Sequence, residues 1–129
     1  GILLKSTEEL SPSWELIFEP ARSRVSITRY PVALDPFWEG LNPKIKDAPM
    51  EVDGPRTIER PLHIEKGKEI DLKCFVDDSF VECFVNEEVA LSFRIYDPTD
   101  GAPIYKFGLF SEDDTVEIRD IHLREESDL

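Results

Sequence analysis

The stretch from Ile70 to Asn86 decides the fold, and it reads IDLKCFVDDSFVECFVN. Apolar residues occupy every second position on both sides of a polar centre, Asp77-Asp78-Ser79. Such an alternation is typical of β-strands with one buried face, because successive side chains of a strand point to opposite sides of the sheet. Two strands of this kind separated by a short polar turn predict an antiparallel hairpin.

A two-residue turn at Asp78 and Ser79 would place Cys74 directly opposite Cys83. Counting outward from the turn, this pair falls at a non-hydrogen-bonded site, where Cα atoms approach to roughly 4.5 Å. A disulfide is sterically compatible with that spacing. A reduced pair is the alternative, since free cysteines behave as small apolar side chains in a core. Zinc is disfavoured, because two thiolates without a nearby histidine do not complete a tetrahedral shell.

The opposite face of the same hairpin is rich in phenylalanine. Alternation places Phe75, Phe80 and Phe84 on it, together with Glu82. Three phenylalanines on a face turned away from the core suggest that another domain covers it or that it lines a groove. A buried glutamate would need a partner such as Arg94 to stay charged. We therefore expect these four residues to form a domain-packing face.

Five further segments show strand-like patterns: 14–18, 24–28, 89–96, 105–110 and 115–123. We expect the first two to pair through residues 20–23 and the last two through the acidic turn 112–114. Helical spacing is hard to find, and parallel strands would need crossover helices. The sequence therefore predicts an all-β fold, an antiparallel β-sandwich of the jelly-roll or lectin-like type.

The length of 129 residues fits one domain, so we expect residues 1–129 to form a single sandwich module. A proline-rich stretch at about 31–55 breaks the strand pattern and predicts a long ordered loop. Trp38 lies near its middle and either packs the loop onto the sandwich or serves a function. Because the chain begins with Gly1 rather than Met, we expect it to be a fragment of a longer protein.

The composition excludes several classes of partner. The chain has 28 acidic and 15 basic residues, giving a net charge of -13, which repels nucleic acids and anionic membrane surfaces. No apolar run approaches the roughly 20 residues that a membrane-spanning helix needs. We expect a soluble domain that binds neither nucleic acid nor membrane.

Catalytic and metal-binding motifs are not found. The two histidines, His63 and His122, lie far apart in the sequence, and no motif places a nucleophile beside either. Carboxylates are abundant, but no spacing marks a pair for glycoside cleavage. The acidic turn 112–114 lacks the ligand spacing of an EF-hand, so we interpret it as solvated. We expect no catalytic residue, no metal and no cofactor.

The stretch 70–86 resembles the hairpin signature in the C-terminal sandwich of glycoside hydrolase family 32, the family of invertases, levanases and inulinases. The resemblance continues through 90–96, 108–112, 116–118 and 121–123 in the same order. The resemblance is good from about residue 60 to residue 124, and it is fair over the segment 14–28. The proline-rich loop departs from the usual pattern, which indicates a divergent relative.

The resemblance implies a role without catalysis. In such enzymes the catalytic carboxylates lie on a five-bladed propeller that precedes the sandwich, and this chain carries only fragments of their motifs, such as Arg119-Asp120 and Glu82-Cys83. The implied function is to stabilise or shape a fructan- or sucrose-cleaving propeller in the same polypeptide, and no catalytic residue is carried over. A sugar-processing role would suit secretion or a periplasm.

An independent carbohydrate-binding module is the competing interpretation. Exposed aromatic rings can stack on sugar rings while neighbouring polar side chains hold hydroxyl groups. Trp38, Tyr30 and Tyr105 are the candidates. A free-standing enzyme is a third, less favoured reading.

Overall fold

The computed structural model describes residues 1–7, 9–10, 13–30, 58–95, 107–112 and 115–125. In these ranges the chain forms eight β-strands and one 3-10 turn, η1. A five-stranded antiparallel sheet has the order β4-β3-β2-β1-β8, and a three-stranded antiparallel sheet has the order β5-β6-β7. The bounds are β1 Ile2–Ser6, β2 Ser13–Glu19, η1 Pro20–Arg22, β3 Arg24–Tyr30, β4 Ile58–Pro61, β5 Leu72–Asp77, β6 Phe80–Val85, β7 Val89–Arg94 and β8 Gly108–Leu109.

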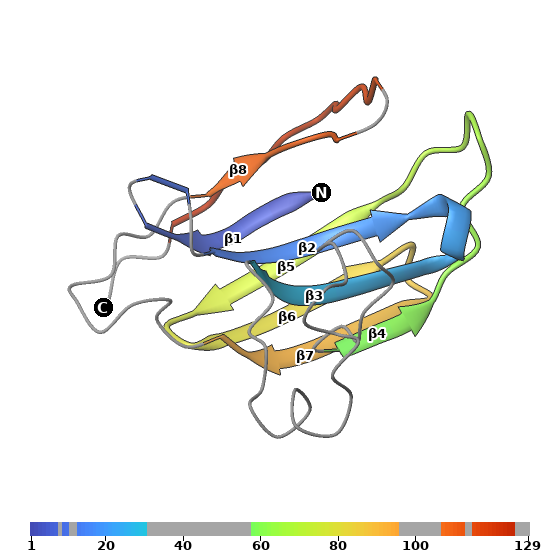
Figure 1. Ribbon diagram of the computed structural model, residues 1–129. Coiled ribbons are helices and arrows are strands. Elements are labelled where there is room, and N and C mark those ends of the chain that lie inside the picture. The colour runs from blue at the N-terminus through green and yellow to red at the C-terminus, as the bar shows by residue number, and fades with distance from the viewer. Residues whose placement is uncertain (8, 11–12, 31–57, 96–106, 113–114, 126–129) are drawn as a thin grey trace, which may run out of the picture.

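The two sheets lie face to face, as Figure 1 shows, with β2 and β3 in front of β5, β6 and β7. One side chain from each sheet illustrates the contact: the ring of Trp14 in β2 lies 5.8 Å from that of Phe93 in β7. The buried core combines both inner faces: Leu4, Trp14, Leu16, Val25, Ile27, Leu62, Val81, Cys83, Val85, Leu91 and Ile95. The prediction of an all-β antiparallel sandwich is confirmed.

Two of the three predicted hairpins are present. Strands β2 and β3 pair from Ser13 to Tyr30, and the connection between them is η1 followed by Ser23, which has a left-handed φ of 48°. Strands β5 and β6 pair with Cys74 opposite Cys83, as the two-residue turn requires. The register predicted from the turn length is therefore confirmed.

Asn86 anchors the end of the hairpin formed by β6 and β7. Its side-chain oxygen accepts the N–H of Asp71 at 2.8 Å, and its own N–H donates to the carbonyl of Asp71 at 2.8 Å. Asn86 and the following Glu87 both have left-handed φ values, 54° and 56°. Left-handed φ at both central residues is the type I′ conformation, whose twist suits an antiparallel hairpin.

Two strands were not predicted, β1 and β4. The sequence of β1, ILLKS, begins with three consecutive apolar residues and does not alternate, and its pairing with β2 shifts register between Leu3 and Lys5. Strand β4 has four residues and ends at Pro61, a residue that cannot donate to a ladder and is confined to sheet edges or strand ends. Both segments therefore lack the period-two signal.

The predicted strand 115–123 is wrong, since the structure assigns no strand within residues 115–125. The alternation changes phase at Asp120, from Val116 and Ile118 to Ile121 and Leu123, and Asp120 has a left-handed φ of 52°. A left-handed residue interrupts the extended backbone that a ladder needs. In the predicted strand 105–110, only Gly108–Leu109 forms a strand within the described residues, and the proline-rich loop 31–55 lies outside them.

Candidate functional site

The outward side of the sheet β5-β6-β7 carries the candidate site. Because Val81, Cys83, Val85 and Leu91 are buried in the core, the alternate side chains of these strands point outward. The register aligns them in three rows across the sheet: Lys73, Phe84, Ala90; Phe75, Glu82, Ser92; and Asp77, Phe80, Arg94. We call Phe75, Phe80, Glu82 and Phe84 the phenylalanine face. The register therefore places these four residues on the same outward side of the sheet, and their role in domain packing stays a prediction.

The phenylalanine face is open to solvent in this chain. Phe75 is 60% exposed and Phe80 is 40% exposed, whereas Phe84 is half-buried. The rings of Phe75 and Phe84 meet edge to face, with centroids 6.2 Å apart and planes at 78°. Aromatic rings that pack on one another at a surface form a contiguous apolar patch, and such patches commonly mark interaction sites.

Glu82 lies among these rings and is half-buried. The hydroxyl of Ser92 donates to its carboxylate over 3.3 Å. Arg94, which was named as a partner that a buried Glu82 would need, instead donates from its guanidinium to the Ser79 hydroxyl at 3.2 Å. The reason is the register, which places Ser92 in the same row as Glu82 and Arg94 one row further along.

Three contributors to this surface were not singled out from the sequence: Lys73, Ala90 and Ser92. They occupy the outward positions of the two strands that flank β6. Alternation within residues 89–94 could have identified Ala90 and Ser92, once the pairing with β6 was fixed by the turn at Asn86.

The outward side of the five-stranded sheet differs from this surface. Its residues Ser13, Ser26 and Thr28 alternate with core residues, so they point away from the core, and yet they are buried. On the outward side of the three-stranded sheet, by contrast, Phe75 of β5 and Phe80 of β6 are exposed.

The sugar-binding candidates are placed only in part. Tyr30 lies at the end of β3 and is 47% exposed. Trp38 and Tyr105 lie outside the described residues. The described residues thus include one of the three candidates, Tyr30, and the sugar-binding set stays a prediction.

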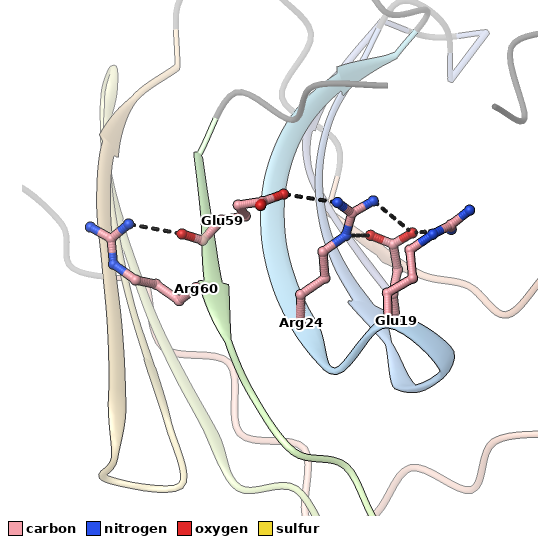
Figure 2. A network of polar contacts seen from close by, with 5 residues as sticks. Glu19, Arg24, Glu59 and Arg60 are labelled. Atoms are coloured by element: carbon pink, nitrogen blue, oxygen red, sulfur yellow. Dashed lines mark hydrogen bonds and ion pairs between the residues drawn. The ribbon is translucent and has the colours of Figure 1, made fainter. Parts of the chain in front are cut away.

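A charged cluster lies where β2, β3 and β4 meet. The guanidinium of Arg24 contacts Glu19 at 2.6 Å and Glu59 at 2.9 Å, and Arg60 donates to the Glu59 carbonyl at 2.8 Å (Figure 2). Arg22 adds a contact to Glu19 at 2.8 Å. Because Arg24 on β3 pairs with carboxylates from both β2 and β4, the cluster links three strands.

The remaining polar features offer little chemistry. A shallow hollow of about 280 Å³ is lined by His63, Ile64, Glu65, Lys68, Glu69, Ile70 and Asn86. Nowhere in the described ranges do three or more His, Cys, Asp or Glu side chains gather as a metal ion would need. Within the same ranges, no helix has both the length and the apolar character that crossing a bilayer requires.

The two cysteines face each other on the inner side of the hairpin. Their sulfur atoms are 2.6 Å apart, and both cysteines are free thiols in this structure. The hydrogen bond between the thiols lowers the pKa of Cys74, whereas the same bond, reinforced by burial, raises the pKa of Cys83. The two cysteines also differ in exposure, since Cys83 is buried and Cys74 is half-buried.

Comparison with known proteins identifies the family. A family model described as glycosyl hydrolases family 32 C terminal matches residues 1–125. Searches of curated proteins and of solved structures found no match. The matched region covers nearly the whole chain and includes every described strand of both sheets. The chain therefore belongs to the family of C-terminal regions of the glycosyl hydrolases of family 32.

Proposed function

We propose that this chain is the non-catalytic C-terminal module of a fructan- or sucrose-hydrolysing enzyme. It stabilises or shapes a catalytic domain in the same polypeptide, a five-bladed propeller that precedes it. Membership in the family of glycosyl hydrolase C-terminal regions supports the class of enzyme. The observation that carries the proposal is the exposed phenylalanine face on β5 and β6.

The phenylalanine face has the composition of an interface between domains. Its exposed rings would contribute apolar area at about 25 cal/mol per Å² buried. Lys73, Asp77 and Arg94 lie at the corners of the three rows and would form a polar rim around them. A catalytic domain covering this surface would remove the rings from water and would leave the charges at the edge.

The test uses the full-length polypeptide proposed to contain this module. Replacing both Phe75 and Phe84 with Ser should lower the melting temperature of the catalytic domain and shorten the half-life of its activity on sucrose or fructan. The reason is that truncating a residue at the centre of an interface costs about 2 kcal/mol or more when that residue is a hot spot. Phe107→Ser is a matched control, since Phe107 is 49% exposed and lies outside the phenylalanine face. Equal effects of the double variant and the control would contradict the proposal.

A sugar-binding role is the second candidate, and the exposure of Tyr30 favours it. Calorimetric titration of the chain with sucrose, inulin and levan should then show binding that Tyr30→Ala weakens. Binding that is absent for all three sugars would remove this candidate and would leave the packing role untouched.

A further inference from the structure

The hairpin geometry places the thiols of Cys74 and Cys83 where one covalent bond can join them. The residues are directly opposite each other in the ladder of β5 and β6. Asp77 and Phe80 close the turn, so the cysteine pair falls at a non-hydrogen-bonded site, where cross-strand side chains lie closest. With the sulfurs 2.6 Å apart, only a small movement separates them from the length of a disulfide bond, about 2.05 Å.

The two sulfurs differ in their access to solvent. Cys83 is 0% exposed on the central strand β6, between the core residues Val81 and Val85. Cys74 is half-buried, because β5 is an edge strand of its sheet. Val76, the next inward residue of β5, is exposed for the same reason. A small reagent can therefore reach Cys74 first.

The hydrogen bond between the two thiols favours the thiolate of one cysteine and disfavours that of the other. The pKa of Cys74 is lowered by its hydrogen bond to Cys83, which favours the thiolate, and the thiolate is the nucleophilic form of cysteine. The pKa of Cys83 is raised by the same hydrogen bond, by burial and by the charge of Glu82.

We infer that Cys74 and Cys83 form a reversible redox pair, in which Cys74 is the entering thiol and Cys83 is the resolving thiol. The oxidant is a small-molecule disulfide. This inference does not rest on the proposed function.

The chemistry is thiol–disulfide exchange. The Cys74 thiolate attacks one sulfur of the small disulfide, whose S–S bond breaks, and one small thiol leaves with the proton released by Cys74. The Cys83 sulfur then attacks the Cys74 sulfur of the mixed disulfide. The second small thiol leaves with the Cys83 proton, so one disulfide is reduced as one is formed.

Oxidation would fix the edge strand β5 to β6 directly beneath the phenylalanine face, since Phe75 and Phe84 each adjoin one cysteine in sequence. A covalent link of this kind restricts separation of the two strands. Amide hydrogen exchange in β5 should slow on oxidation and recover on reduction.

The test is mass spectrometry of the 129-residue chain after incubation in mixtures of oxidised and reduced glutathione, followed by alkylation. The chain has two cysteines, so each product is unambiguous. We expect an oxidised species that lacks two hydrogens, takes up no alkylating reagent and reverts on reduction. Two alkylated cysteines in oxidising mixtures, or only glutathione adducts and disulfide-linked dimers, would overturn the inference.

Single variants test the order of attack. Cys83→Ala keeps the core apolar and should accumulate a glutathione adduct on Cys74, whereas Cys74→Ala should leave Cys83 unmodified while circular dichroism shows a folded chain. Equal modification of the two variants would overturn the assigned order. If a variant does not fold, the wild-type mass measurement still decides whether the pair forms.

Discussion

At the scale of single residues, the turn after β6 combines a well-suited residue with a poorly suited one. Asn86 tolerates its left-handed φ and also binds the backbone of Asp71 through its side chain. Glu87 has the same backbone conformation without such an advantage, and its contact with Lys73 is an exposed ion pair at 3.7 Å. Exposed pairs of this kind contribute little to stability.

Replacing Glu87 with Gly should raise the free energy of unfolding by about 0.5–1 kcal/mol, because glycine adopts left-handed φ without a steric penalty. The neighbouring Glu88→Gly is the control: Glu88 is not among the residues with positive φ, so glycine there should leave stability unchanged or lower it. Urea unfolding of both variants provides the measurement. A loss of stability in Glu87→Gly would show that the left-handed conformation is not strained.

At the scale of elements, predictability followed the length and regularity of the apolar pattern. The cysteine hairpin was predictable down to its register, because a two-residue turn leaves each residue one partner. Strands β1 and β4 were not, since β1 begins with three consecutive apolar residues and does not alternate, and β4 has four residues ending in proline. The segment 115–123 alternates, but the phase change at Asp120 shows that alternation alone does not supply a ladder partner.

The side chain of Arg24 is largely buried and adds ion pairs with Glu19 and Glu59 to the backbone ladders that join β2, β3 and β4. Arg24→Ala should lower the free energy of unfolding by about 1–3 kcal/mol, because it leaves two carboxylates, one of them largely buried, without this partner. Arg22→Ala removes a more exposed pair with the same Glu19 and should cost at most about 0.5 kcal/mol. Thermal unfolding of the two variants gives the comparison. Equal losses in the free energy of unfolding would argue against a special role for Arg24.

At the scale of the whole molecule, the sandwich has two outward faces with different surroundings. On the five-stranded sheet, Ser13, Ser26 and Thr28 are buried, whereas the phenylalanine face of the three-stranded sheet is exposed. The sequence predicted the phenylalanine face, because its members lie on one hairpin and alternation relates them directly. The sugar-binding set combined Tyr30 with residues from two other segments, and no periodicity relates segments that are far apart in sequence.

The most direct measurement is hydroxyl-radical footprinting of phenylalanine in the full-length polypeptide and in this chain alone. Phe75 and Phe107 are exposed to similar extents in the chain, 60% and 49%, so their oxidation rates should be similar there. In the full-length polypeptide we expect oxidation of Phe75 to fall several-fold relative to Phe107. An unchanged ratio would mean that no domain covers the phenylalanine face and would contradict the proposed packing role.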